Sequence, residues 1–215
     1  VPMVELAVRC MLGEKLRDMG YGTGLYPTGD YCAVKVPVFS FEKLHDVDTQ
    51  LGPEMKSTGE CLGVSKNYNE ALYKAFLGAG INLPKYKKMI LTVKDSDKID
   101  AVDIGRRFVD LGYEIFSTRS TCRVLNENGV PAHPINKLEE ESPNLLDLIL
   151  DDKIDLIIDT PSQGVGRSRD GFLIRRYAIE TGVTCLTSLD TADALLTSLE
   201  SGSRDNLSVV DIAQI

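Results

Sequence analysis

The chain has 215 residues, of which 43% are apolar, so it is long enough to fill the core of one large domain or two small ones. Its formal net charge of -8 disfavours non-specific binding to nucleic acid, which needs clustered Lys and Arg to replace counterions. No apolar run is long enough to cross a bilayer, and the first residues lack the basic region and cleavage-like site of a signal peptide. We therefore expect a globular cytoplasmic protein that binds neither membranes nor nucleic acid.

The first 80 residues contain few regular elements. The patterns predict a helix over residues 4–19, a strand over residues 31–41 and a helix over residues 68–77. Asn67 followed by Glu70 is typical of a capped helix start. One strand is too little sheet for an independent α/β domain, although a small α+β domain of its own remains an alternative.

From residue 88 onward, strands and helices are predicted to alternate. The strands are expected at residues 89–93, 113–117, 132–135, 156–159 and 184–186, and the helices at residues 97–111, 121–128, 144–151, 171–181 and 191–199. Such alternation implies a doubly wound parallel sheet, which binds ligands beyond the carboxyl ends of its strands. Pro84 lies in a stretch that is typical of a linker, so we predict domains over residues 1–82 and 88–215. The apolar tail from residue 207 is expected to pack back onto the body.

Polar side chains gather where the predicted strands end. Ser117 to Thr121 form a hydroxyl-rich turn before a helix, and the backbone N-H groups of such a turn attract anions. Ordinary helix capping explains the same turn equally well. Lys98, Lys137 and Asp159 follow or end other predicted strands. They are therefore expected at the same rim, which is the edge of the sheet where the carboxyl ends of its strands lie. Each lysine alone is typical of solvated surface, but together they indicate a site for a phosphate or a carboxylate.

Residues with obvious catalytic chemistry are few. His45 lies in the first part of the chain, and His133 lies inside a predicted strand, where a structural role is expected. There is no nucleophile elbow, no dinucleotide-binding glycine fingerprint and no Walker loop. The five cysteines are scattered, which favours neither a zinc site nor a disulfide framework. The sequence therefore predicts a binding site and assigns no catalytic residue or metal ligand.

Two stretches resemble a known family. Residues 35–41 (Lys-Val-Pro-Val-Phe-Ser-Phe) and 52–60 (Gly-Pro-Glu-Met-Lys-Ser-Thr-Gly-Glu) are similar to the late part of the second ATP-grasp half of the carbamoyl phosphate synthetase large subunit. Residues from about 88 onward resemble the carboxy-terminal regulatory domain of the same subunit. The resemblance implies a methylglyoxal synthase-like α/β fold, preceded by an α+β remnant of an ATP-grasp domain.

The resemblance also implies a function for the parent enzyme. That enzyme makes carbamoyl phosphate from bicarbonate, glutamine-derived ammonia and ATP, for pyrimidine and arginine synthesis. Its ATP and magnesium would be held upstream of this chain, and its partners would include the rest of the large subunit and a small glutaminase subunit. The resemblance therefore implies that this fragment does not catalyse the reaction by itself.

An effector site follows from the same resemblance. In bacterial relatives a nucleotide monophosphate is held at places that correspond to Lys98, Thr118, Thr121 and Lys137, with a further contact region at Asp159 and Thr160. Arg119 and Ser162 are additional candidate anion contacts.

The chain departs from the family pattern at the further contact region, where relatives commonly have Asn-Thr-Thr and this chain has Asp159-Thr160-Pro161. The Asp159 carboxylate would repel a phosphate, and Arg119 is expected to offset that repulsion. UMP and IMP therefore both stay open as effectors. Ornithine is not carried over, because the aromatic residue expected near Cys185 is missing.

Two other functions remain as alternatives. A stand-alone methylglyoxal synthase needs an aspartate in a Gly-Gly-Asp stretch, and the corresponding residues 139–143 (Glu-Glu-Glu-Ser-Pro) have none. An interaction fragment without a small ligand would leave the rim empty. Stabilisation of the fold by a small anion would separate that alternative from an effector domain.

Overall fold

The computed structural model describes the whole chain except residues 44–48, 82–84, 152, 162–169, 202–206 and 213–215. Its described residues form two compact units, residues 1–30 and residues 31–214. No helix in the described part is long and apolar enough to span a membrane.

The first unit is a short helix with an irregular continuation. Helix α1 (Met3–Met11) is followed by the 3-10 helix η1 (Leu16–Met19). The predicted helix over residues 4–19 is therefore wrong in length. Gly13 adopts a φ of 99°, in the left-handed region that ends helices, and it separates the two pieces. Leu6 is the one large apolar side chain of the described part of this unit that is buried.

The second unit contains the predicted parallel sheet. Its strands are β3 (Lys88–Thr92), β4 (Glu114–Thr118), β5 (His133–Ile135), β6 (Leu156–Asp159) and β7 (Thr184–Leu186). They lie in the order β5-β4-β3-β6-β7, and every neighbouring pair is parallel. Met89 of β3 is level with Ile115 on one side and Leu156 on the other. The five strands expected from the sequence are confirmed.

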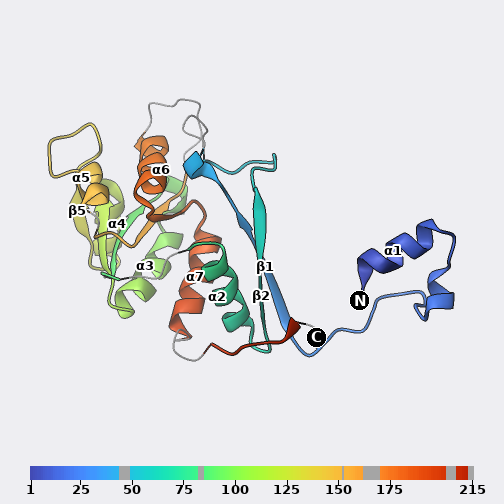
Figure 1. Cartoon of the computed structure of the whole chain (residues 1–215). Coiled ribbons are helices and arrows are strands. Elements are labelled where there is room, and N and C mark those ends of the chain that lie inside the picture. Colours follow the sequence, from blue (N-terminus) through green and yellow to red (C-terminus); the bar gives the residue numbers. More distant parts are fainter. Residues whose placement is uncertain (44–48, 82–84, 152, 162–169, 202–206, 213–215) are drawn as a thin grey trace. The chain divides into compact units, whose positions relative to one another are not determined.

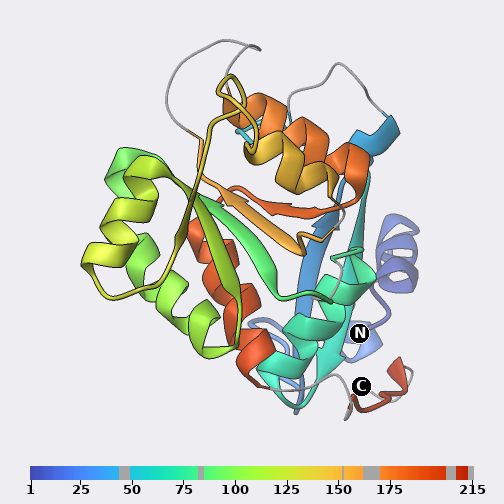
Figure 2. The ribbon, with the colours of Figure 1, turned by 90° about the vertical axis from the view of Figure 1, so that its left-hand side faces the viewer.

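Helices cover both faces of this sheet, as Figure 2 shows. They are α3 (Asp100–Asp110), α4 (Arg119–Glu127), α5 (Leu145–Leu150), α6 (Asp170–Thr181) and α7 (Leu189–Glu200). Alternate residues of a strand point to opposite faces. Met89 and Leu91 accordingly join a core with α3, α4 and α7, whereas Ile90 joins a core with α5 and α6. The sheet is therefore buried on both sides, as a doubly wound fold requires.

Residues 31–81, the ribbon segment, precede the parallel sheet. Strands β1 (Cys32–Val38) and β2 (Gly59–Ser65) pair antiparallel, and α2 (Tyr68–Gly78) packs across them (Figure 1). A Cβ atom on Gly63 would lie 1.9 Å from the carbonyl oxygen of Ala71, so only glycine permits this close approach. Leu72 and Phe76 of α2 belong to the same core cluster as the parallel sheet. The ribbon segment therefore shares a core with the sheet.

Strand β2 was missed by the sequence analysis. Its first residues, Gly59 and Glu60, end the charged Gly-Pro-Glu-Met-Lys-Ser-Thr-Gly-Glu stretch, which has neither helical nor extended periodicity. Pairing with β1 over seven residues determines its extended conformation. The strand is thus a consequence of a tertiary partner and not of local pattern.

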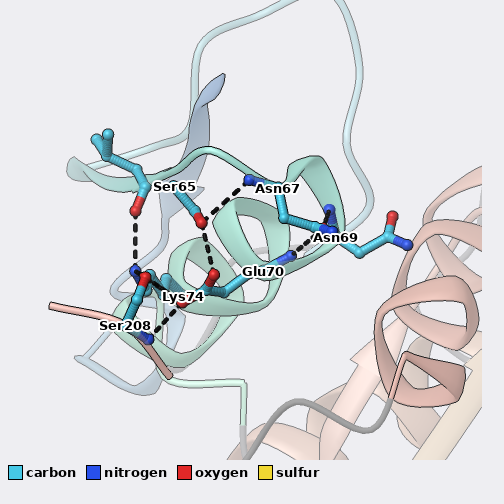
Figure 3. A network of polar contacts seen from close by, with 7 residues as sticks. Ser65, Asn67, Asn69, Glu70, Lys74 and Ser208 are labelled. Carbon is cyan, nitrogen blue, oxygen red and sulfur yellow. Dashed lines mark hydrogen bonds and ion pairs between the residues drawn. The ribbon is translucent and has the colours of Figure 1, made fainter. Parts of the chain in front are cut away.

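The start of α2 and the chain's tail are joined by a polar network (Figure 3). Asn67 caps the helix as predicted, and its side chain accepts hydrogen bonds from the backbone of Asn69 and Glu70. The Glu70 carboxylate accepts from the Ser65 hydroxyl at 2.5 Å and from both the backbone and the hydroxyl of Ser208, at 2.6 and 2.7 Å. Lys74 lies 3.1 Å from the same carboxylate.

The tail lies on the body, and only part of its apolar surface is buried there. Leu207 and Val210 are half-buried, whereas Val209 and Ile212 are 99% and 70% exposed. The contacts of Ser208 with Glu70 and Lys74 add a polar attachment that was not expected.

Candidate anion-binding site

The carboxyl ends of β5, β4, β3 and β6 lie side by side at one edge of the parallel sheet, because these strands are consecutive neighbours. Four of the predicted site segments follow these ends. Residues after β3 include Lys98, α4 begins directly after β4, Lys137 follows β5, and Thr160 follows β6. The rim expected from the sequence is therefore present.

The amino terminus of α4 offers unpaired donors. Thr118 is the N-cap residue, in extended conformation, and among the described residues its side chain makes no capping hydrogen bond. Thr121, in the first turn of α4, is 1% exposed, and its hydroxyl has no hydrogen-bond partner in the described part of the chain. A buried hydroxyl without a partner costs free energy. A ligand with an acceptor oxygen would satisfy both this hydroxyl and the helix amides.

Lys98 is directed at the same helix. Its ammonium lies 2.5 Å from the Asp95 carboxylate and donates to the Ser120 hydroxyl at 3.0 Å. The side chain is only 13% exposed. Hydrogen bonding to Lys98 and its positive charge lower the pKa of Asp95. The lysine is thus positioned across the gap between the β3 end and α4.

The loop after β5 is attached to α4 by Arg119. The Arg119 guanidinium donates to the Asn136 side chain at 2.9 Å and lies 3.8 Å from the Glu140 carboxylate. Glu140 in turn accepts from the backbone N-H of Lys137 at 2.9 Å. Arg119 is therefore used to hold this loop, while the Lys137 ammonium is exposed and has no partner among the described residues.

Asp159, the last residue of β6, is buried and paired. Its carboxylate accepts from Arg175 of α6 at 2.7 Å, and both side chains are less than a tenth exposed. Burial raises the pKa of Asp159 to about 6, although the charge of Arg175 opposes that rise. The expected compensation by Arg119 does not involve a contact with Asp159, since Arg119 faces the loop after β5. Arg175 supplies the neighbouring positive charge instead.

Thr160 is also occupied within the fold. Its hydroxyl accepts from the backbone of Lys94 at 3.0 Å, and its own backbone N-H donates to Thr92. It therefore ties the end of β6 to the segment that follows β3. Ser162, the remaining candidate, lies outside the described residues.

The structure places some of the predicted residues at the start of α4, whereas others are bonded to protein groups. Four of the predicted residues lie at or beside the start of α4, and we refer to them as the anion site: Thr118, Thr121, Lys98 and Lys137. Asp159 and Thr160 lie at the adjoining strand end, with their polar atoms bonded to protein groups. Arg175 was missed by the sequence analysis. The signal for it was an arginine among the apolar positions of a helix, directly after Ile174.

A separate apolar cavity lies beside the end of β7. It has a volume of about 720 Å³ and is lined by residues of β1, α2, α6, β7 and α7 and by neighbouring loop residues, among them Phe41, Phe76, Cys185 and Thr187. This cavity is formed within the second unit, between the ribbon segment and the sheet. The described residues that line this cavity contain no group of His, Cys, Asp or Glu side chains that could hold a metal ion.

Comparison with known proteins finds relatives of this chain. Residues 100–187 match the family model described as an MGS-like domain. The whole chain is 67% identical to a carbamoyl phosphate synthase large chain of Lachnoclostridium phytofermentans, and 60% identical to that of Agathobacter rectalis; in both cases it spans 20% of the relative's length. A crystal structure of methylglyoxal synthase from Elizabethkingia anophelis NUHP1 matches with a TM-score of 0.44 at 21% identity, over 53% of this chain and 79% of that one.

The chain thus spans about a fifth of the length of the curated relatives that it matches. The match to those relatives extends over the ribbon segment as well as the parallel sheet, since it includes all 215 residues of the chain. Over its whole length the chain is thus similar to carbamoyl phosphate synthase large chains, and it corresponds to their carboxy-terminal region with the MGS-like domain.

Proposed function

We propose that residues 88–215 bind a small phosphorylated effector, of the nucleoside monophosphate class, and thereby regulate ATP-dependent carbamoyl phosphate synthesis by a large chain of this family. The observation that carries the proposal is the buried Thr121 hydroxyl, which has no partner among the described residues and lies in the first turn of α4. The uncapped helix start provides amide donors beside it.

Charge supports the same ligand class. The chain as a whole carries a formal charge of -8, yet Lys98 and Lys137 border the anion site. A local cluster of donors holds an anion even on an acidic protein, because charge-assisted hydrogen bonds act at short range. Each such bond contributes about 1.5 to 3 kcal/mol.

The remaining roles belong to the whole large chain. In that chain, ATP and magnesium would act upstream, a small glutaminase subunit would supply ammonia, and the product would serve pyrimidine and arginine synthesis in the cytoplasm. We propose that residues 1–82 are the end of an ATP-grasp domain, with a linker before residue 88. The described residues contain no group of His, Cys, Asp or Glu that could hold a metal ion, and we derive no catalytic step in this chain.

Calorimetric titration tests the proposal. UMP and then IMP are added to the 215-residue chain and to a Lys137→Ala variant. Saturable binding of one nucleotide is expected, with the variant at least about tenfold weaker because one charged hydrogen bond is lost. Lys153→Ala is the matched control, since Lys153 is also an exposed lysine but precedes β6, at the other edge of the sheet.

The control variant should bind like the parent chain. Absence of saturable binding by either nucleotide would overturn the effector proposal and favour an interaction fragment. Equal weakening by both lysine variants would show that general charge, and not the anion site, attracts the ligand.

A further inference from the structure

Two consecutive arginines of α6 have side chains directed to two different parts of the second unit. Arg175 donates to the Asp159 carboxylate at 2.7 Å, at the rim of the parallel sheet. Arg176 donates to the Phe41 carbonyl oxygen at 3.3 Å, in the ribbon segment, and to the Glu180 carboxylate at 2.8 Å. The two arginines are 5% and 7% exposed. Helix α6 therefore bridges the end of β6 and the ribbon segment through buried charged groups.

The contact at the rim is tight. A Cβ atom built on Gly171 would lie 3.1 Å from the Arg175 guanidinium and 3.2 Å from the Asp159 carboxylate. The first turn of α6 is thus packed directly against the ion pair. A change in the position of either partner has to be accommodated by α6, because a close-packed interior transmits displacement.

The contact with the ribbon segment is more extensive than one hydrogen bond. Arg175 also lines a small pocket of about 150 Å³ together with Phe39, Phe41 and Leu51. The rings of Phe39 and Phe41 are stacked, with centroids 5.1 Å apart and planes inclined by 5°. Phe41 begins the 3-10 helix η2 (Phe41–Lys43), in which the Lys43 backbone N-H donates to the Ser40 carbonyl oxygen at 3.1 Å. Arg175 therefore lines a pocket with the short stretch of the ribbon segment to which Arg176 is hydrogen-bonded.

We propose that α6 transmits the occupancy of the anion site to residues 39–43, with Arg175 as the contact to the rim and Arg176 as the positioning residue for Phe41. The inference rests on the proposed function, because it needs an anion at the rim. A bound phosphate adds negative charge at the sheet edge where Asp159 ends β6, and this charge attracts the Arg175 guanidinium toward that edge, although it disfavours the charged form of Asp159. Helix α6 is then held more firmly against the rim, and Arg176 is held against the Phe41 carbonyl.

The charged groups around Asp159 agree with this role. Arg175 and Asp170 face it from α6, and the Cys185 thiol faces it from β7. Burial raises the pKa of Asp159 to about 6, so its charge changes close to neutral pH. A buried ion pair adds little to stability compared with apolar packing, whereas removal of one partner leaves an uncompensated buried charge, so Asp159 and Arg175 hold each other in place.

Hydrogen exchange of the 215-residue chain tests the proposal at pH 7.5, with UMP or inorganic phosphate as the probe. Saturating probe is expected to slow amide exchange in residues 39–43 at least threefold. Arg176→Gln should bind UMP with a Kd within twofold of the parent chain, measured by calorimetry, but should lose the slowing at residues 39–43. Arg176→Lys keeps the charge and cannot reach Glu180 and Phe41 together, so it should behave in the same way if the glutamine variant does not fold.

Arg107→Gln is the matched control. Arg107 bonds Glu200 at 2.7 Å and also contacts Asp193 and Thr197, so it ties α3 to α7 without touching α6. This variant should keep both binding and the slowing. If the parent chain binds no probe, the proposed function fails; if it binds the probe and residues 39–43 do not respond, or still respond in the Arg176 variants, the role of α6 is overturned.

Discussion

Thr121 carries a buried side chain whose polar atom is left unsatisfied among the described residues. Its hydroxyl is buried without a partner in the described part of the structure, so its removal should not harm the free fold. We predict that Thr121→Val raises the free energy of unfolding by about 1 kcal/mol and weakens phosphate or UMP binding about tenfold, because the ligand loses a buried donor. Urea unfolding and calorimetry measure the two effects.

A higher free energy of unfolding together with weaker ligand binding is expected only if the hydroxyl serves the ligand. A Ser117→Ala variant is the control, since the buried Ser117 hydroxyl already donates to the Leu91 carbonyl oxygen at 2.7 Å. Its loss should destabilise the fold by about 1 kcal/mol. Loss of stability in Thr121→Val would indicate that the hydroxyl has a structural partner after all.

Helix α2 and the tail are the elements whose attachment depends on one carboxylate. Hydrogen bonds from Ser65 and Ser208, with a contribution from Lys74, lower the pKa of Glu70 to about 2 despite partial burial. Because the folded-state pKa lies below the ordinary value near 4.5, the ionised network stabilises the fold above pH 4.5, and this stabilisation is lost as the pH falls toward 2. We predict that Glu70→Gln lowers stability at pH 7 by about 2 kcal/mol and removes most of that pH dependence.

Urea unfolding between pH 2.5 and 7 measures this effect, and hydrogen exchange of residues 207–212 reports on the tail. Glu60→Gln is a suitable control, because Glu60 is a well-exposed carboxylate on the neighbouring strand β2, paired with Lys35. A Glu70 variant with unchanged acid sensitivity would contradict the assigned network.

We predict that the second unit unfolds as a whole in one step. Phe76 of the ribbon segment lies in the same core cluster as Met89, Phe108 and Leu196 of the parallel sheet and its helices. Phe76→Ala should cost about 3 to 5 kcal/mol through lost burial and the cavity left behind. Two probes are compared within each protein: circular dichroism, which follows mainly the sheet and its helices, and amide exchange in β1. The two probes should give one common urea midpoint in the parent chain, and one common, lower midpoint in the variant.

Separate midpoints for the two probes would contradict a shared core. They would also favour the alternative that the ribbon segment is an independent small domain. Leu62→Ala serves as a control, because Leu62 is 62% exposed on β2 and its truncation should change the midpoint little.

Much of the parallel-sheet fold follows from local pattern. The strand β3 is a short continuous apolar run followed by a helix with an apolar face, which is the pattern of a strand buried on both sides, so the strand and the helix after it were readable in the sequence. The start of α2 was equally readable, because an Asn at the cap binds backbone groups only two and three residues away. The rim with Lys98, Thr121 and Lys137 followed from the rule that parallel strands end at one edge.

Other features do not follow from the apolar pattern. Gly13 ends α1 early through its local left-handed conformation, although the apolar spacing continues beyond it. Strand β2 exists because β1 pairs with it, and the tail is attached because Ser208 meets Glu70, 138 residues earlier.

The sequence by itself determined the order of the elements from residue 88 onward, the doubly wound sheet and the candidate donors at its edge, because these depend on periodicity and strand direction. Only the tertiary structure decided that Asp159 is paired with Arg175, that Arg119 serves the loop after β5, and that the Thr121 hydroxyl is left without a partner among the described residues. The reason is physical. A local pattern specifies which face a side chain is on, whereas burial and the choice of a charged partner depend on which distant elements pack against that face.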